Sequence, residues 1–390
     1  MKFLIKLKRY FALLSLIFYA NHLSWAQDNT SELVADSFQS VMDYVAETET
    51  EAPAAARIYA ITAITLHDIW QISQNEQTFL NVTMSTHAIT KHDMSSAFHT
   101  AIQALIESGF DLAKIPHAPK TDSQIILRNV LKKIALPQPI LQTIPETFIE
   151  EVGAYYVHPE WKNAPPLTLT SAAMFRPLGP PLIGSEVYES AFEEVRQLGE
   201  DVSEYRLSDH SLTAAFWGDA AGTYTGPGHW NAIALTATTN LLTPDRLKVL
   251  LALNVAMYDV SIAAWESKYY FMAERPTPAI RRLSAEDSTW NAMGDIPRHP
   301  EYVSGHSAFS AAAAKVLTLS LGSKTFCSTV PHLWDLTRCF ESFDEAAKEA
   351  GQSRIYGGIH FQFANQDGLK LGKTVGHHSY QVLKQQGLLP

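Results

Sequence analysis

The sequence predicts a protein built almost entirely of α-helices. Segments with apolar residues at three- and four-residue steps recur along the chain, and several begin with residues that favour helix starts. Alternation with a period of two, which is typical of half-buried strands, is not sustained in any segment. With 46% apolar and 18% charged residues, the 390-residue chain can bury a large core, as one domain or two closely packed ones.

Residues 1–26 have the pattern of a signal peptide. Four Lys and Arg residues precede the apolar run FALLSLIFYA, and Ser24-Trp25-Ala26 offers a cleavage site with small residues at both ends. The apolar run is short for a membrane anchor, which is the alternative interpretation. We therefore expect an exported protein whose mature chain has no membrane span.

The net charge disfavours anionic partners. It is −10 for the full sequence, and loss of the four cations in 1–26 would make it four units more negative. Nucleic acid and anionic membrane surfaces are therefore not expected as partners. A cationic site in so acidic a protein has to be built locally.

Two cysteines are present, Cys327 and Cys339. In an oxidising compartment a disulfide between them would stabilise the fold by closing a loop, and two inert thiols are the alternative. Their spacing fits neither a zinc site nor a Cys-x-x-Cys redox pair.

The amino-terminal region, 27–154, is predicted to be helical, with helical periodicity at 31–47, 53–72, 94–111 and 121–135. His67 and Asp68 lie within the second of these segments. We interpret them as packing residues of a core helix rather than as catalytic groups.

A proline-rich stretch, 155–184, follows. Its six prolines are too many for a helix or a central strand. Its many aromatic and aliphatic residues would be poorly solvated in a loose linker, so we expect an extended but ordered crossover. It is the predicted boundary between 27–154 and a second helical region, 185–390.

The second region is predicted to contain helices at 186–199 and 209–220 and a terminal helix at 365–387. The motif GTYTGPGHWN, 222–231, reads as a glycine-rich turn, and its His229 and Trp230 either support that turn or line a pocket mouth. The adjacent His377 and His378 would point to different sides of the terminal helix, which favours a solvated surface over a metal site.

A long helix begins at Thr243, where a hydroxyl cap is followed by proline and an acidic residue. Trp265, Lys268 and Arg275 fall on one face of it, so the two cations would lie about 10 Å apart along the axis and point the same way. Such a pair favours a bound anion. Pro276 disfavours helical geometry in the residue before it, which predicts a helix end at Arg275.

A second motif, Ser304-Gly305-His306, directly precedes an alanine-rich helical run, 307–321. Ser304 can cap this helix, and the free N–H groups at its start would stabilise an anion. Gly305 would let the backbone approach that anion, and His306 would be placed for proton transfer at its edge.

A third motif runs from Ser353-Arg354 to His360, with Gly357-Gly358 between them. On one regular helix Arg354 and His360 would point about 240° apart. We expect the glycines to break the helix and let both side chains converge.

The order Lys-x6-Arg-Pro, Ser-Gly-His and Ser-Arg-x5-His resembles the signature of the vanadium-dependent haloperoxidases and the related phosphatidic-acid-type phosphatases. SRIYGGIHF and the tryptophan three residues before the lysine are more similar to the peroxidases, and PAAARIYAITAITLHD is similar to the amino-terminal helix of the bacterial ones. The resemblance implies an all-α fold of helical bundles with an anion site among helix ends.

The resemblance also implies roles for the motif residues. His360 would ligate vanadium, His306 would be the acid–base residue, and the vanadate oxygens would be bound by Lys268, Arg275, Ser304, Gly305 and Arg354. Hydrogen peroxide and a halide would be the substrates, with a small organic acceptor as a further candidate, and no redox change at the metal would be required. Three fixed cations would neutralise vanadate and draw electron density from bound peroxide.

Two positions depart from the family pattern. Val303 replaces a proline that mainly stiffens the entry to the helix. Ala364 replaces an aspartate that, in many members, is a candidate partner for the ring of the ligand histidine. Asp367 lies nearby but out of phase, so the hydrogen bonding around His360 is the feature in question.

The choice of halide and of reaction leaves alternatives. His299 falls where bromide- and iodide-selective relatives can carry histidine, which favours these halides unless His299 is a plain surface residue. Trp265 either forms the wall of the pocket on the side of the halide or is a residue of the hydrophobic core. The same pocket would also suit an exported acid phosphatase with His360 as nucleophile and His306 protonating the leaving oxygen, or a helical protein that binds oxyanions without turnover.

Overall fold

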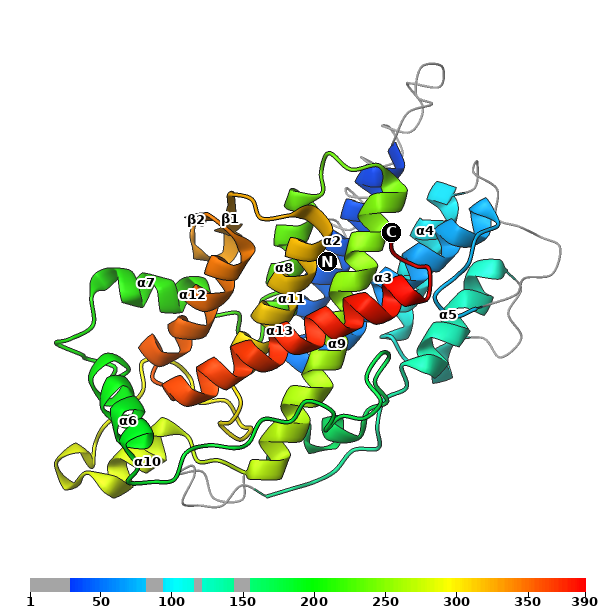
Figure 1. The fold of residues 1–390 in the computed structure, drawn as a ribbon. Coiled ribbons are helices and arrows are strands. Elements are labelled where there is room, and N and C mark those ends of the chain that lie inside the picture. The colour runs from blue at the N-terminus through cyan, green and yellow to red at the C-terminus, as the bar shows by residue number, and fades with distance from the viewer. Residues whose placement is uncertain (1–28, 82–93, 116–120, 144–154) are drawn as a thin grey trace, which may run out of the picture.

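The computed structural model describes residues 29–81, 94–115, 121–143 and 155–390, and there the chain is helical with one short β-hairpin (Figure 1). The predicted signal peptide, 1–26, lies outside the described residues. Before the crossover lie α2 (Asn29–Glu47), α3 (Ala52–Gln74), α4 (Met94–Ser108) and α5 (Asp122–Lys133). After it lie α6 (Glu186–Leu198), α7 (Ser208–Phe216), α8 (Thr225–Ala237), α9 (Thr243–Phe271), α10 (Pro276–Leu283), α11 (Gly305–Leu321), α12 (Phe343–Tyr356) and α13 (Gln362–Gln385). The predicted all-α class is confirmed.

Helix α9 is the centre of the assembly. It packs against α3, α11 and α13, while α4 and α5 lie on one side of it and α6, α7 and α10 on the other (Figure 1). Within the described residues, the stretch Thr243–Leu283 is long and apolar enough to cross a membrane, but 94% of its apolar window is buried inside the protein. Its composition is therefore that of a core helix. The helix begins at Thr243 as expected, but the prediction that the Thr243 hydroxyl caps it was wrong, because the N-cap residue is Leu242 and no side chain caps the helix.

Helices α11 and α13 touch backbone to backbone along a stripe of small residues. Gly368, Gly372 and Gly376 recur every fourth position on α13, which places them on one face. A Cβ at Gly372 would lie 2.1 Å from the carbonyl oxygen of Ala308, and one at Gly368 would lie 2.7 Å from that of Ser304. The absence of side chains at these glycines therefore fixes how closely the two helices approach.

The proline-rich crossover follows the surface of α9. Asp259 of α9 accepts hydrogen bonds from the backbone N–H groups of Leu167 and Thr168, both at 2.7 Å. The indole N–H of Trp161 donates to Ser261 Oγ at 2.9 Å. The stretch is therefore ordered, as expected, but it is not extended throughout, because Pro159–Asn163 form a short 3-10 helix. The domain boundary placed there stays a prediction.

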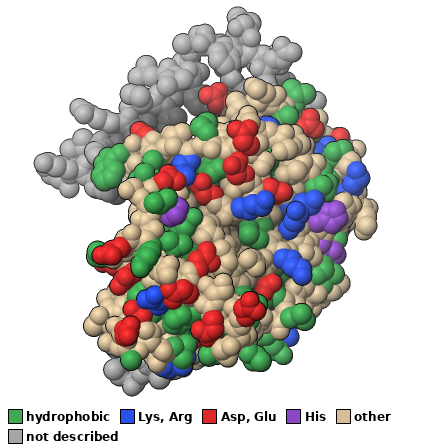
Figure 2. Space-filling view, turned by 60° about the vertical axis from the view of Figure 1, so that its left-hand side comes forward, with side chains coloured by type: hydrophobic (Ala, Val, Ile, Leu, Met, Phe, Trp, Pro, Cys, Tyr) green, Lys and Arg blue, Asp and Glu red, His purple; other side chains and the backbone are tan. Residues whose placement is uncertain are grey.

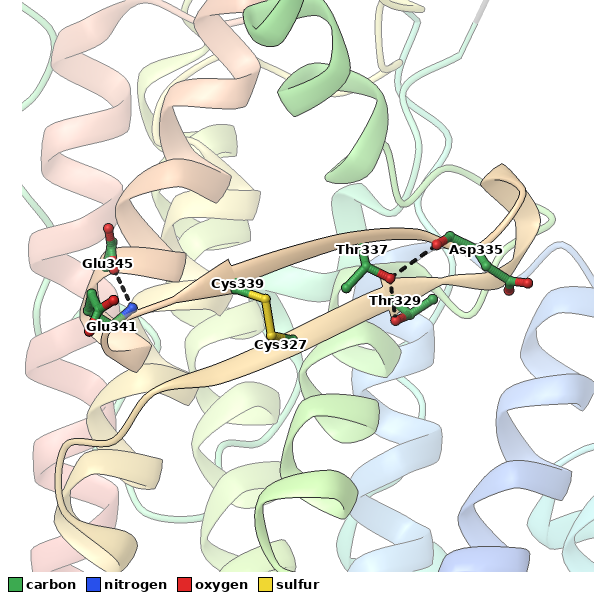
Figure 3. The surroundings of a disulfide bond; sticks show 7 residues. All are labelled: Cys327, Thr329, Asp335, Thr337, Cys339, Glu341 and Glu345. Carbon is green, nitrogen blue, oxygen red and sulfur yellow. Dashed lines mark hydrogen bonds between the residues drawn. A yellow bond between two sulfur atoms is a disulfide. The ribbon is translucent and has the colours of Figure 1, made fainter.

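One β-hairpin joins α11 to α12, and the sequence analysis did not anticipate it. Strands β1 (Phe326–Val330) and β2 (Leu336–Phe340) are antiparallel, and Cys327 faces Cys339 across the ladder. The two residues form the expected disulfide (Figure 3). Five-residue strands are too short for their alternation to stand out from the sequence.

The expected glycine-rich turn at 222–231 was wrong over most of its length, because α8 begins at Thr225. Proline is compatible with the first turn of a helix, so Pro227 does not prevent it. His229 and Trp230 are fully buried inside this helix. The expected packing role of His67 and Asp68 agrees with the structure: both are buried in α3, with His67 Nδ1 2.8 Å from Asp68 Oδ1.

Substitution of Gly372 by alanine should destabilise the fold. The added Cβ would overlap the Ala308 carbonyl, so α11 and α13 would have to separate, at a cost of about 2–3 kcal/mol. Denaturant unfolding of the purified variant measures this loss. The control is Lys373→Ala on the exposed side of the same helix, where removal of a solvent-exposed ion pair with Asp344 should cost under about 1 kcal/mol. Equal stability of the two variants would contradict the close-packing interpretation.

Candidate active site

The three motif segments meet at one cavity of about 670 Å³. Six of the predicted site residues line it: Trp265, His299, Gly305, His306, Arg354 and His360. The other three lie in the protein just behind the wall. Arg275 contacts His360, Lys268 contacts the backbone before Ser304, and Ser304 precedes Gly305. The structure therefore brings all nine residues to one region.

Arg275 reaches this region by a different route from the one expected. Helix α9 ends at Phe271, and Met272 adopts a left-handed conformation with φ 51°. Arg275 precedes α10 with extended geometry, φ −73° and ψ 159°, as the following proline requires. The prediction that Arg275 continues the face of Lys268 was therefore wrong. Its guanidinium instead donates to the carbonyl oxygens of His299 and Ile359, at 2.9 and 2.7 Å.

Lys268 is fully buried on the last turn of α9. Its ammonium group donates to the carbonyl oxygens of Pro300 and Glu301, at 2.8 and 3.0 Å. Because an ammonium group has three N–H bonds, one donor remains for another acceptor. Burial lowers the pKa of Lys268 well below its usual value, and Arg275 lowers it further while Glu301 raises it. An anion bound nearby would therefore favour the charged form.

Glu301 is a site residue that the sequence analysis missed. It is fully buried, and its Oε1 lies 2.8 Å from His360 Nδ1 and accepts the N–H of Phe361 at 3.0 Å. Nδ1 of His360 therefore carries the proton, which leaves Nε2 with its lone pair. Nε2 lies 3.1 Å from Nη1 of Arg275. Burial lowers the pKa of His360 well below its usual value, and Arg275 and Lys268 lower it further, so the ring is neutral.

Glu301 supplies the carboxylate partner for His360 that Ala364 cannot provide. The carboxylate that orients the ring of His360 comes from the segment before α11 instead of from α13. Asp367, the out-of-phase candidate, accepts from the hydroxyl of Tyr302 at 2.7 Å instead. The signal available in the sequence was slight: Glu301 is an acidic residue in HPEYVSGHS, three positions before Ser304.

Ser304 caps α11 as expected. Its Oγ accepts the N–H of Ser307 at 3.3 Å, and its own N–H donates to the carbonyl of Ala364 at 3.1 Å, which ties the start of α11 to α13. The N–H groups of Gly305 and His306 then stand at the free end of the helix dipole. A Cβ at Gly305 would lie 3.6 Å from the ring of Trp265, so it would occupy space beside the cavity.

His306 is a partly exposed residue of the first turn of α11. Its Nε2 is nevertheless enclosed by protein and has no hydrogen-bond partner within the described residues. Burial lowers the pKa of His306 to about 3, and Arg354 contributes in the same direction. The ring is therefore neutral above acidic pH, with one nitrogen unsatisfied.

Arg354 lies in the last turn of α12, and its guanidinium contacts the C-terminal end of α7. Nη2 donates to the carbonyl oxygens of Ala214 and Trp217, at 3.1 and 2.5 Å. Nη1 lies 3.5 Å from the carbonyl of Gly218. Burial lowers the pKa of Arg354 to about 10, and Asp219 acts in the opposite direction. Carbonyl dipoles thus orient this cation.

Two glycines turn the chain between Arg354 and His360, as expected. Helix α12 ends at Tyr356, and Gly358 has φ 74°, a left-handed conformation that glycine adopts at low cost. A Cβ at Gly358 would lie 2.3 Å from the carbonyl of Gly199. The turn lets both side chains line the same cavity.

His299 lines the cavity, which rules out the plain surface alternative. Its Nδ1 accepts a hydrogen bond from Arg275 Nη2 at 3.0 Å, and its ring lies 5.0 Å from that of Trp265. Burial lowers the pKa of His299 well below its usual value, and Lys268 and Arg275 lower it further. Trp265 is buried, and its indole N–H has no hydrogen-bond partner within the described part of the chain.

The donor set around the cavity suits vanadate. Among the described residues, no group of three His, Cys, Asp or Glu side chains could hold a metal ion. Vanadate differs from a simple metal ion, because it would be bound through one nitrogen ligand and through cations and N–H donors around its oxygens. His360 offers the nitrogen. Lys268, Arg275 and Arg354 offer the charge. The unsatisfied Nε2 of His306, which costs about 1–3 kcal/mol when buried without a partner, would gain one from a ligand in the cavity.

The cationic region contrasts with the exterior of the protein. Acidic side chains are spread over much of the face in Figure 2, in keeping with the net charge of −10. Lys268, Arg275 and Arg354 are at most 5% exposed. The local cationic site expected from the charge of the chain is therefore built inside the protein.

Comparison with known proteins agrees with this arrangement. A family model described as the second helical-bundle domain of VCPO matches residues 248–387, the part of the chain that contains all three motifs. No individual curated protein matched the chain.

Solved structures match over most of the chain. One described as the first bacterial vanadium-dependent iodoperoxidase is 25% identical, has a TM-score of 0.74, and is matched over 90% of this chain and 96% of that one. Two of bacterial vanadium-dependent chloroperoxidase, apo and holo, are each 15% identical, with TM-scores of 0.63 and 0.61. They are matched over 90% and 94% of this chain and over 95% and 98% of theirs. The match of residues 248–387 to the family model and the likeness in fold support assignment of the chain to the vanadium haloperoxidase family.

Proposed function

We propose that this protein is a vanadate-dependent haloperoxidase that oxidises iodide or bromide with hydrogen peroxide. The observation that carries the proposal is the hydrogen bond between Glu301 and His360. A histidine whose Nδ1–H is held by a buried carboxylate presents Nε2 as a ligand, and this arrangement is common among metal-binding histidines. Arg275, Lys268 and Arg354 around it supply positive charge for the oxyanion.

Each residue of the site would have a separate role in binding vanadate or in transferring protons. His360 would hold the metal through Nε2. Lys268, Arg275, Arg354, the hydroxyl of Ser304 and the N–H of Gly305 would hold the oxygens. When bound, vanadate would supply a Lewis-acid centre that activates peroxide without a change in oxidation state. His306, which is neutral before the anion binds, would accept a proton from hydrogen peroxide at Nε2.

The halide preference is proposed from the wall formed by Trp265 and His299. Both side chains line the cavity, and the contact of His299 with Arg275 holds that cation on the same side. The likeness to a structure described as an iodoperoxidase, with a TM-score of 0.74 against 0.63 and 0.61 for the two structures described as chloroperoxidases, supports iodide. A small organic acceptor is a further candidate partner for a cavity of about 670 Å³.

We also propose that the protein is exported and acts outside the cytoplasm. The cationic and apolar pattern of residues 1–26 supports export. The disulfide between Cys327 and Cys339 supports it independently, because such bonds persist in oxidising compartments.

The mature protein should oxidise iodide or bromide when orthovanadate and peroxide are both present. An assay of iodide, bromide and chloride with and without orthovanadate, beside a phosphate ester, measures the activity. His360→Ala should abolish it, and His377→Ala, on the exposed side of α13, should not. Ester hydrolysis that orthovanadate inhibits, without halide oxidation, would establish the phosphatase instead. Oxyanion binding with neither activity would establish a binding protein.

Glu301→Gln should lower the affinity for orthovanadate by about 10–100-fold, because an amide oxygen is a weaker acceptor than a carboxylate for the Nδ1–H of His360. Calorimetric titration with orthovanadate measures the change. The matched control is Asp367→Asn, which removes the nearby carboxylate that contacts Tyr302 instead of His360, and its affinity should match the wild type. Equal effects of the two variants would contradict the role given to Glu301.

His306→Ala should lower kcat by about 100-fold or more if His306 transfers protons, with a much smaller effect on orthovanadate affinity. Steady-state kinetics with iodide, compared with the same titration, separates the two quantities. Losses of equal size in kcat and affinity would make His306 a structural residue of the site.

A further inference from the structure

A second buried carboxylate–histidine pair lies beside Arg354. His229 Nδ1 is 3.1 Å from Asp219 Oδ1, and His229 Nε2 is 3.1 Å from Ser328 Oγ. All three side chains are at most 7% exposed. Asp219 lines the cavity, and Ser328 lies on β1 next to the disulfide-bonded Cys327. The hydrogen bonds therefore connect the cavity wall to the disulfide hairpin.

Asp219, His229 and Ser328 are connected in the order of a serine hydrolase triad. Their burial, however, prevents the Ser328 hydroxyl from attacking a substrate. His229 is 0% exposed, and its ring packs on Trp217 at 4.6 Å and on Phe216 at 5.2 Å. Ser328 is 7% exposed on the covered side of its strand. An acyl group cannot approach the hydroxyl between these surfaces, so the three residues can orient one another but cannot act as a nucleophile.

Asp219 is the last residue of the segment 214–219, whose backbone carbonyls contact the guanidinium of Arg354. The carbonyl oxygens of Ala214, Trp217 and Gly218 face its guanidinium, and Asp219 is the next residue. Burial raises the pKa of Asp219, but His229 and, further away, His306 and Arg354 bring it below its usual value. A charged Asp219 thus lies within electrostatic reach of both cavity residues.

The hairpin is also connected to this segment at Trp217, through Glu349. The indole N–H of Trp217 donates to Glu349 Oε1 at 3.0 Å, and Glu349 is paired with Arg338 of β2 at 2.8 Å. The three carbonyls therefore lie in a segment that is anchored at Trp217 through β2 and at Asp219 through β1.

We propose that His229 is a positioning residue for the oxyanion site, which holds Asp219 and the carbonyls beside it against Arg354 and is itself held by Ser328 of the disulfide hairpin. The inference rests on the proposed function of the site. It assigns His229 no contact with substrate. Nδ1 of His229 lies within hydrogen-bond distance of Asp219 and Nε2 within hydrogen-bond distance of Ser328, so each ring nitrogen has one partner.

Two substitutions separate the two contacts of His229. The amide nitrogen of asparagine falls near the position of Nδ1, so His229→Asn keeps a donor for Asp219 and loses Ser328. The amide of glutamine falls near Nε2, so His229→Gln keeps a partner for Ser328 and loses Asp219. We expect His229→Gln to weaken orthovanadate binding by about 10-fold or more, and His229→Asn to stay within about 3-fold of the wild type.

The experiment is calorimetric titration of the mature full chain with orthovanadate and with inorganic phosphate, beside its melting temperature. His67→Gln is the matched control, because His67 and Asp68 form an equally buried pair on α3, at 2.8 Å, that does not line the cavity. It should lower the melting temperature and leave both affinities unchanged. A positioning role predicts a loss of affinity that does not follow the loss of stability.

Ser328→Ala covers the case in which the His229 variants fail to fold, since it removes one hydroxyl group. It should weaken orthovanadate binding in the same direction as His229→Gln and by less. Unchanged affinity in His229→Gln or, where that variant does not fold, in Ser328→Ala would overturn the inference, and so would an equal loss in His67→Gln. A wild-type chain that binds neither oxyanion would overturn the proposed function instead, so the two failures are distinguishable.

Discussion

Three buried cations around one cavity are held by backbone carbonyls, and the rest of the site depends on this arrangement. Lys268 donates to the carbonyls of Pro300 and Glu301, and Arg354 to those of α7 and the residues after it. Within the described residues neither they nor Arg275 has a carboxylate at ion-pair distance. Carbonyl dipoles orient a cation but do not neutralise it, and burial makes the remaining charge costly. An anion in the cavity would relieve that cost, which is the physical reason to expect one.

The carboxylates that do lie near the cations are each engaged by a histidine. Glu301 binds Nδ1 of His360, and Asp219 binds Nδ1 of His229. A carboxylate that accepts an imidazole N–H is less available to form an ion pair with a neighbouring arginine. The two pairs therefore orient the rings of the histidines and engage carboxylates that could otherwise pair with the cations.

Much of this organisation could be predicted from the sequence, because it depends on local rules. Proline and an acidic residue mark the start of α9, Ser304 caps α11, and Gly357-Gly358 end α12. What escaped prediction depends on contacts between distant segments. Glu301 and His360 are 59 positions apart, and His229 and Ser328 are 99 apart, so no spacing rule connects them. Arg275 left the expected helix face because Met272 takes a left-handed conformation, which a methionine rarely does.

The glycine stripe between α11 and α13 has a consequence for any change of specificity. Because the backbone of Gly368 abuts the carbonyl of Ser304, the start of α11 is held against α13 by main-chain contact, with no side chain between them to trim or enlarge. A change in the size of the cavity would therefore have to come from side chains that line it, such as Trp265 and His299. Anchoring of the helix and shaping of the cavity thus fall to different residues.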